Sequence, residues 1–160
     1  MGNYEVTIGS EGQDEMKRYL QGVLNAHHEA AYPLMEVPQS KWFVLRAVDR
    51  DGRLVGGALM WAYWGWADVN LVAVETEARG CGVGRLLMAA IEDKAREEGC
   101  TRLRVETFDQ EMGFYQRLGY RTVGHLEDYP QGYSYYWLRK DLAAPGGDRG
   151  ADGRGGGQGR

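Results

Sequence analysis

The residues best suited to chemistry in this 160-residue chain are a run of glycines between two arginines, Arg79–Arg85 (RGCGVGR). Glycines let the backbone approach a phosphate closely, and an arginine at each end adds positive charge. The run falls between a strand expected to end near Val74 and a helix expected to begin near Gly82. Because the first N–H groups of a helix have no partners and its dipole favours negative charge, the pattern predicts an anion-binding turn.

Spacing limits the kinds of glycine loop that this run can form. A mononucleotide phosphate loop needs GxxxxGK[ST], which the sequence lacks, and the dinucleotide pattern GxGxxG fails because its last position is Arg85. A methyltransferase loop, GxGxG, is matched by Gly80, Gly82 and Gly84. That loop belongs to a larger doubly wound sheet and follows its first strand, so it is kept as a distant alternative. The pattern that remains is Arg79-x-x-Gly82-x-Gly84.

The segments around this run predict a mixed fold with a mostly antiparallel sheet. Asp51-Gly52 is a strong hairpin signal between two apolar stretches, and Gly65 marks a second tight turn. Gly99 and Gly119 each end a helix-like stretch. The order strand, helix, three strands, helix, strand, helix, two strands indicates the α+β class, an α/β sandwich. The expected strands are 4–8, 42–48, 54–63, 66–74, 103–107, 120–126 and 133–138, and the expected helices are about 14–31, 82–98 and 109–118.

Composition narrows the classes of function. The chain has a formal charge of −4 and 43% apolar residues, as is ordinary for a soluble globular protein, and no apolar run is long enough for a transmembrane helix. A signal peptide is not expected, because the N-terminus has neither a basic start nor an apolar run. Two cysteines make no disulfide framework and no metal site, so we expect a cytoplasmic protein without a metal. The charge argues against a nucleic-acid partner and leaves a cationic substrate open.

One domain boundary is visible near the C-terminus. After Leu142 the chain is rich in Gly and Arg and has no large apolar residue. Burial cannot offset the entropy cost of ordering such a segment, so we expect 143–160 to be a disordered tail, whose role is open. The remaining residues, 1–142, are enough for one domain with a sizeable core.

Two segments together resemble the GNAT superfamily of N-acyltransferases. The pattern Arg79-x-x-Gly82-x-Gly84 is similar to the family's acetyl-CoA signature, which lies between its fourth strand and third helix. The stretch 113–120 (GFYQRLGY) resembles the family's second signature, a helix of the FYxxLGF type followed by a strand. The resemblance covers about residues 4–141.

The resemblance extends to a subgroup and to a fold. The stretches 63–66 (YWGW) and 126–132 (LEDYPQG) look like a bacterial subgroup of the family for which no single substrate is agreed. The family implies a GNAT-like mixed, mostly antiparallel sheet flanked by helices, with a V-shaped splay between the fourth and fifth expected strands.

The same resemblance implies acetyl-CoA as the co-substrate. Its pyrophosphate is expected over the glycine turn, where backbone N–H groups and the two arginines would hold it. Its pantetheine arm is expected to pair with the edge of the fourth strand, as an added strand would. The residues implied in binding are Leu71, Val72, Ala73, Val74, Arg79, Gly80, Cys81, Gly82, Val83, Gly84, Arg85, Phe114 and Tyr115.

The implied reaction is direct acyl transfer, in which an amine attacks the thioester carbonyl and the CoA thiolate leaves. A backbone N–H near Val74 could donate to the oxyanion that forms. Tyr115 falls where the family often keeps a tyrosine that protonates the thiolate.

The candidate general base is Asp68, eleven residues before the signature arginine. The histone-acetylating branch of the superfamily carries its general-base Glu at this spacing, and the shorter Asp would work through a water. Glu106 is a further candidate, on a strand near the site. Four residues of the fourth strand are expected to alternate onto one face: Asp68, Asn70, Val72 and Val74.

The sequence therefore predicts an acetyl-CoA-dependent N-acetyltransferase that acts on a primary amine of a small molecule. Three alternatives stay open: the same fold with another acyl donor, either a longer acyl-CoA or an aminoacyl-tRNA; a non-catalytic CoA-binding module; and the methyltransferase pattern. No membrane partner is expected, and a homodimer stays open.

Overall fold

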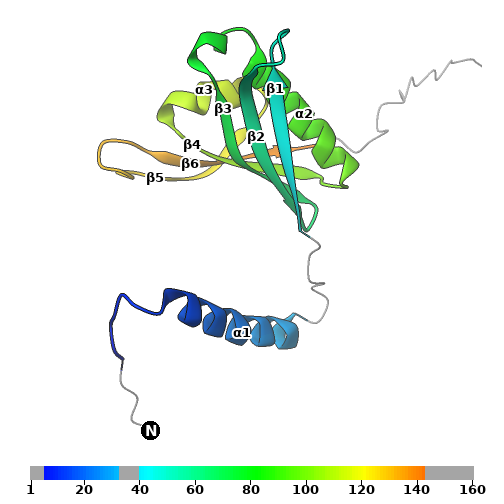
Figure 1. Ribbon diagram of the computed structural model, residues 1–160. Coiled ribbons are helices and arrows are strands. Elements are labelled where there is room, and N and C mark those ends of the chain that lie inside the picture. Colours follow the sequence, from blue (N-terminus) through cyan, green and yellow to red (C-terminus); the bar gives the residue numbers. More distant parts are fainter. Residues whose placement is uncertain (1–5, 33–39, 143–160) are drawn as a thin grey trace, which may run out of the picture. The chain divides into compact units, whose positions relative to one another are not determined.

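The computed structural model describes residues 6–32 and 40–142 (Figure 1). These residues fall into two compact units, one on each side of residues 33–39. The first unit contains helix α1, Gln13–Ala31, close to the helix expected at 14–31. The second contains every strand that the described residues form.

Two predicted segments, the C-terminal tail and the first strand, fall wholly or partly outside the described residues. The expected tail, 143–160, and residues 1–5 lie outside them. The strand expected at 4–8 does not form in its described part, because residues 6–8 have no regular secondary structure. The extent of the domain, 1–142, stays a prediction.

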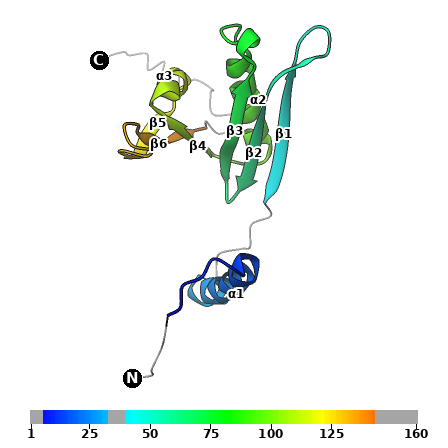
Figure 2. The ribbon, with the colours of Figure 1, turned by 60° about the vertical axis from the view of Figure 1, so that its left-hand side comes forward.

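The second unit is built on one six-stranded sheet with the order β1-β2-β3-β4-β6-β5 (Figures 1 and 2). All neighbouring strands are antiparallel except β3 and β4, which confirms the mostly antiparallel sheet expected from the sequence. The strands are β1 Lys41–Val48, β2 Leu54–Tyr63, β3 Trp66–Val74, β4 Arg102–Phe108, β5 Arg121–Leu126 and β6 Tyr135–Asp141, and the helices are the short η1 Thr76–Ala78, α2 Val83–Glu97 and α3 Asp109–Arg117.

Strands β3 and β4 pair over only part of their length. Trp66–Val69 of β3 pairs in parallel with Arg102–Val105 of β4, and beyond this point no pairing joins the two strands. Figure 2 shows β4 running away from β3. The expected splay between these strands is therefore present. Among the described residues, the last part of β3, residues 70–74, pairs with β2 alone, so the backbone groups on its other edge have no strand partner in that part of the chain.

A β-bulge in β3 corrects one expectation. Leu71 pairs with Leu59 and Val69 pairs with Met60, so Asn70 is an extra residue with no opposite partner in β2. An extra residue reverses the alternation of side chains between the two faces. The prediction of one shared face for the alternating residues of this strand was therefore wrong.

The two faces of β3 can be assigned from its partners in β2. Asp68 pairs with Trp61, whereas Val72 pairs with the buried Ala58. Trp61 and Ala58 lie on opposite faces of β2, because they are an odd number of residues apart. Asp68 thus lies on the face opposite to Val72 and Val74.

Helix α2 packs on one face of the sheet. Its residues Met88 and Ile91 are fully buried and belong to the same apolar cluster as Met60 of β2 and Leu103 of β4. Because α2 begins directly after the glycine turn, this packing fixes the turn next to the end of β3.

Helix α3 is anchored to β6 through its first residue. The Asp109 carboxylate accepts a hydrogen bond from the Ser134 N–H at 2.8 Å and another from the Tyr136 hydroxyl at 2.7 Å. These two donors lower the pKa of Asp109. The anchored helix carries Phe114 and Tyr115 toward the divergence of β3 and β4.

Candidate active site

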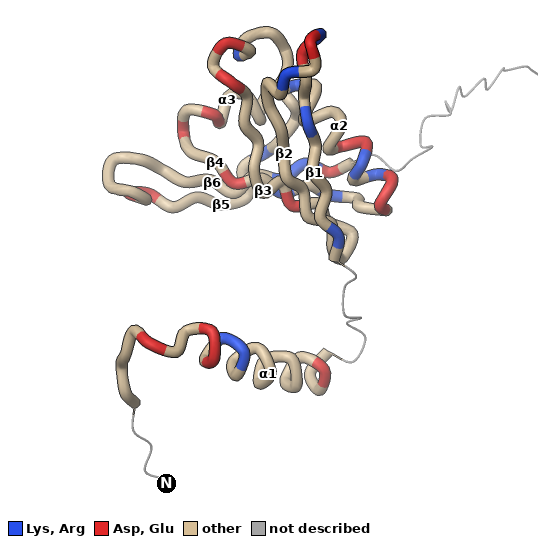
Figure 3. Tube along the Cα trace, in the orientation of Figure 1, with Lys and Arg blue, Asp and Glu red and all other residues tan. Residues whose placement is uncertain are grey.

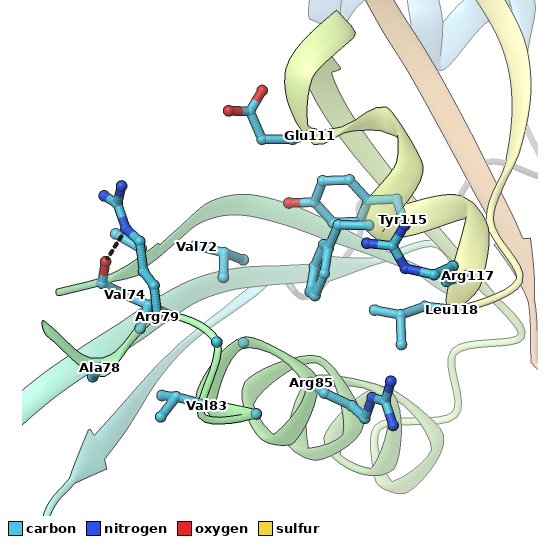
Figure 4. Close-up of a pocket in the computed structure, with 15 residues that line it drawn as sticks. Val72, Val74, Ala78, Arg79, Val83, Arg85, Glu111, Tyr115, Arg117 and Leu118 are labelled. Carbon is cyan, nitrogen blue, oxygen red and sulfur yellow. Dashed lines mark hydrogen bonds between the residues drawn. The ribbon is translucent and has the colours of Figure 1, made fainter. Parts of the chain in front are cut away.

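A cavity lies beside the unpaired end of β3 (Figure 4). Its volume is about 570 Å³, and its walls are the end of β3, the glycine turn and α3. The lining residues are Val72, Ala73, Val74, Ala78, Arg79, Gly80, Gly82, Val83, Gly84, Arg85, Glu111, Phe114, Tyr115, Arg117 and Leu118. Every residue that the resemblance assigned to acetyl-CoA lines this cavity except Leu71 and Cys81. The side chains of these two residues are exposed to solvent.

The glycine turn has the backbone that the sequence predicts. Gly80 and Gly82 adopt left-handed conformations, with φ of +77° and +87°, which L side chains enter only with strain. Gly82 is the N-cap of α2, and no side chain caps the helix there. The first N–H groups of α2 are therefore left for a ligand, and the helix dipole favours an anion. Anion binding at this turn stays a prediction.

Two contacts tie the turn to its neighbours. The Arg79 Nε donates a hydrogen bond to the Val74 carbonyl at 3.1 Å, which holds this arginine against the end of β3 (Figure 4). At Gly84, a Cβ atom would lie 3.4 Å from the Phe114 ring, an ordinary van der Waals contact, so the Phe114 ring of α3 lies close against the first turn of α2. Arg79 and Arg85 together give the turn side of the cavity a positive charge.

Tyr115 presents a buried ring and a hydroxyl directed toward the cavity (Figure 4). The ring makes edge contacts with Phe114 and Tyr120, at centroid distances of 5.0 and 5.7 Å. Burial raises the pKa of the Tyr115 phenol, and the nearby Glu111 carboxylate raises it further. The phenol therefore stays protonated at neutral pH and can donate a proton or a hydrogen bond into the cavity.

Four lining residues were not predicted from the sequence: Ala78, Glu111, Arg117 and Leu118. Helical spacing in the sequence could have identified two of them. Glu111 precedes Tyr115 by four residues and Leu118 follows it by three, so both lie on the same side of α3 as Tyr115.

Asp68, the predicted base, does not line this cavity. Its side chain is almost fully buried and is paired with Arg104 of β4, whose Nη2 and Nε both donate to the carboxylate, the latter at 3.3 Å. The Tyr63 hydroxyl lies 3.5 Å from the same carboxylate. The hydrogen bonds to Asp68 raise the pKa of Arg104. Asp68 is thus held in a hydrogen-bonded ion pair, and its role as a base stays a prediction.

Glu106 continues this network on the same face of the sheet. It accepts hydrogen bonds from the Tyr135 hydroxyl at 2.6 Å and from the Trp137 Nε1 at 3.2 Å, and Arg104 Nη2 lies 3.7 Å away. Burial, followed by the hydrogen bond to Glu106, raises the pKa of Tyr135 to about 12. The Tyr135 phenol therefore remains a donor over the whole physiological range, and Glu106 is well supplied with donors.

The charges of α2 are paired largely among themselves. Figure 3 shows acidic and basic positions interspersed along this helix. Lys94 lies 3.1 Å from Glu97 and 2.9 Å from Glu98, and Arg96 lies 2.8 Å from Asp93. These pairs balance the charges of Lys94 and Arg96 near the C-terminal end of α2, whereas Arg85 in its first turn lines the cavity.

Residues 6–32 and 40–142 contain neither a metal-binding cluster nor a membrane-spanning helix. In these ranges, no group of three or more His, Cys, Asp or Glu side chains could hold a metal ion. No helix in them is long and apolar enough to cross a membrane.

Comparison with known proteins identifies the family of this chain. Residues 10–120 match the model of the acetyltransferase (GNAT) family. A blasticidin-S acetyltransferase from Streptomyces morookaense is 42% identical over 112 residues, which are 69% of this chain and 82% of that protein. An IAA acetyltransferase from Azospirillum brasilense is 33% identical over 126 residues, which are 74% of this chain and 77% of that protein.

Solved structures show the same fold. An acetyltransferase from Bacillus cereus has a TM-score of 0.75 at 23% identity, over 87% of this chain and 98% of that one. A Bacillus anthracis structure in complex with acetyl coenzyme A has a TM-score of 0.59 at 17% identity, over 64% of this chain and 63% of that one.

Proposed function

The chain belongs to the GNAT family of acetyltransferases, and from this premise we propose that it transfers the acetyl group of acetyl-CoA directly to a primary amine of a small molecule. One observation carries the proposal. A turn suited to an anion, an unpaired strand edge and a protonated tyrosine all border one cavity.

The residues around the cavity fit acetyl-CoA part by part. The N–H groups of Gly80, Gly82, Val83 and Gly84 would hold its pyrophosphate, with Arg79 and Arg85 supplying charge. The unpaired edge of β3 would pair with the pantetheine amides. The positive φ angles of the turn support this fit, because they aim successive backbone groups outward without a side chain in the way.

Acetyl-CoA supplies an acetyl group activated as a thioester, and the chain supplies hydrogen-bond donors. A backbone N–H near Val74 would donate to the carbonyl oxygen as negative charge develops there. Tyr115 would give its proton to the sulfur as the carbon–sulfur bond breaks. The raised pKa of Tyr115 supports this role, because the phenol is protonated when the thiolate leaves.

We propose Asp68 as the general base, and a positioning role is the alternative for the same residue. Asp68 would accept a proton from the amine through a water, as its place in the sequence suggests, and Glu106 is the second candidate. The ion pair between Asp68 and Arg104 favours a positioning role for the aspartate. The substitutions Asp68→Asn and Arg104→Met distinguish the two roles.

The proposed acceptor is a small molecule with a primary amine. The relative with 42% identity is called a blasticidin-S acetyltransferase, so blasticidin S is the first acceptor to test. The two described cysteines, Cys81 and Cys100, are both free thiols, in keeping with the cytoplasmic location that we propose.

Calorimetric titration with acetyl-CoA, CoA and S-adenosylmethionine tests the co-substrate. We expect the first two to bind and the third not to bind, and binding of S-adenosylmethionine alone would overturn the proposal. Release of free thiol from acetyl-CoA is then followed with blasticidin S and a panel of primary amines. Turnover of an amine with acetyl-CoA supports the proposed reaction, and acetyl-CoA binding without turnover of any amine would favour a non-catalytic module.

A further inference from the structure

The cavity combines two kinds of charge that a single anionic ligand would not require. Three of its lining residues are arginines, Arg79, Arg85 and Arg117, and one is a carboxylate, Glu111. The arginines suit the phosphates of CoA, but a carboxylate in the same cavity would repel them. Glu111 therefore needs another explanation.

The carboxylate is placed close to the proposed reaction centre. Glu111 lies one helical turn before Tyr115 on the same side of α3, and both residues line the cavity. Figure 4 shows the Tyr115 hydroxyl directed into the cavity and the Glu111 carboxylate at its edge. The electrostatic effect of Glu111 on the Tyr115 phenol agrees with this proximity. An amine bound beside Tyr115 would therefore lie on the side of the cavity that Glu111 also lines.

Glu111 has no polar partner among residues 6–32 and 40–142. Its side chain makes no hydrogen bond or ion pair with any other described residue, and the residue is exposed. Asp109, the other acidic residue in the first turn of α3, accepts hydrogen bonds from Ser134 and Tyr136 and so anchors the helix. Of these two carboxylates, only Glu111 is free to bind a ligand.

We propose that Glu111 binds the ammonium group of the acceptor and places it beside Tyr115, which makes cationic primary amines the preferred substrates. The inference rests on the proposed function, because it needs acetyl-CoA in the cavity. A carboxylate and an ammonium form a charge-assisted hydrogen bond, which is stronger than one between neutral groups. The arginines on the turn side and Glu111 on α3 would then divide the cavity between an anionic and a cationic substrate.

Two thioethers of CoA test this assignment without any need for turnover. S-(3-aminopropyl)-CoA carries an ammonium three carbons beyond the sulfur, on the acceptor side of the cavity, and S-butyl-CoA is its neutral isostere. Calorimetric titration should show that the wild-type protein binds the amino thioether about tenfold more tightly. Glu111→Gln should reduce the preference to less than twofold, with S-butyl-CoA bound at least as tightly as by the wild type.

The control is Glu97→Gln, which removes the same charge from a side chain of α2 that is 66% exposed and outside the cavity. It should keep the full preference. Equal binding of the two thioethers by the wild type, or an unchanged preference in Glu111→Gln, would overturn the role of Glu111 while leaving the proposed function standing. If neither thioether nor CoA itself binds, the proposed function fails and this inference fails with it.

Discussion

Carboxylates on the two sides of the sheet around β3 and β4 have different surroundings. On the sheet face opposite to α2, Asp68 and Glu106 share Arg104 and accept further hydrogen bonds from aromatic side chains. In the cavity on the other side of the splay, Glu111 has no such partner among the described residues, and Tyr115 directs its hydroxyl into open space.

This difference in hydrogen bonding distinguishes side chains that stabilise the fold from side chains that are available to a ligand. A carboxylate whose oxygens already accept several hydrogen bonds must lose some of them before it can serve a substrate, which costs free energy. A carboxylate or phenol without partners in the protein has no such cost. On this ground the cavity residues are expected to control binding and transfer, and the network on the opposite face is expected to control stability.

The largest effect is expected at the glycine turn. Gly82→Asp places a side chain and a negative charge against the pyrophosphate at a position with φ of +87°. We expect the affinity for acetyl-CoA to fall at least about 100-fold in a calorimetric titration, which is about 2.7 kcal/mol. Gly82→Asn is the matched control, because Asn has the same size, tolerates a left-handed backbone better than most residues, and carries no charge. Unchanged affinity in Gly82→Asp would show that the pyrophosphate is not bound at this turn.

The next effect is expected at Tyr115. Tyr115→Phe keeps the ring and its contacts with Phe114 and Tyr120 but removes the proton donor. General-acid help is typically worth about 10²–10⁴-fold in rate, and we expect the low end because a CoA thiolate is already a fair leaving group. Single-turnover rates with an accepted amine, together with CoA binding, measure the loss. A rate within twofold of the wild type, with binding intact, would make Tyr115 a packing residue and leave proton delivery to solvent.

The pH dependence of the wild-type rate tests the same role of Tyr115 as a general acid. Since burial and Glu111 both raise the pKa of Tyr115 above its usual value of 10.0, the acid is protonated at all pH values below this. We therefore expect no loss of single-turnover rate from deprotonation of Tyr115 as the pH rises from 7 to 9.5. A loss in that range that is absent in Tyr115→Phe would contradict the raised pKa.

A smaller effect is expected on the opposite face, at Asp68. Asp68→Asn removes the charge from a buried hydrogen-bonded pair, so we expect it to lower the free energy of unfolding by about 1–2 kcal/mol in a urea titration. The affinity for acetyl-CoA should not change, because Asp68 does not line the cavity.

Arg104→Met is the companion variant, because it breaks the same pair from the other side and leaves the Asp68 carboxylate in place. If the pair is structural, both variants lose stability and neither loses more than a few-fold in kcat. If Asp68 is the base, Asp68→Asn alone should show a large loss of kcat, and that loss should shrink at high pH, where the amine deprotonates unaided.

The smallest effect is expected from removing the Gly- and Arg-rich segment 143–160. Its composition offers almost no apolar surface for burial, so the deletion should leave the Tm and the affinity for CoA nearly unchanged. A fall in Tm of more than about 5 °C, on the order of 1 kcal/mol for a domain of this size, would show that the segment docks on the folded domain.

Features that depend on residues close together in the chain could be predicted without the structure. The glycine turn before α2 and the helix that carries Tyr115 were predicted because their signals lie within a few positions of one another. A left-handed glycine, a helix N-terminus and an amphipathic helix are local structures, so the chain specifies them before any long-range contact forms. The strand order along the chain followed from hairpin and turn signals of the same kind.

Contacts between side chains that are distant in the chain follow from long-range packing and strand register. The bulge at Asn70 is set by the register of β3 against β2, and it moved Asp68 to the face opposite to Val74. The partner of Asp68, Arg104, is 36 residues away along the chain and arrives through the parallel pairing of β3 and β4. Glu111 is distinguished by its place in the cavity wall and by the lack of a comparable partner within the part of the chain that the structure describes. Alternation along a strand cannot reveal an extra residue or a distant ion pair, because both depend on free energies of pairing between segments that are remote in sequence.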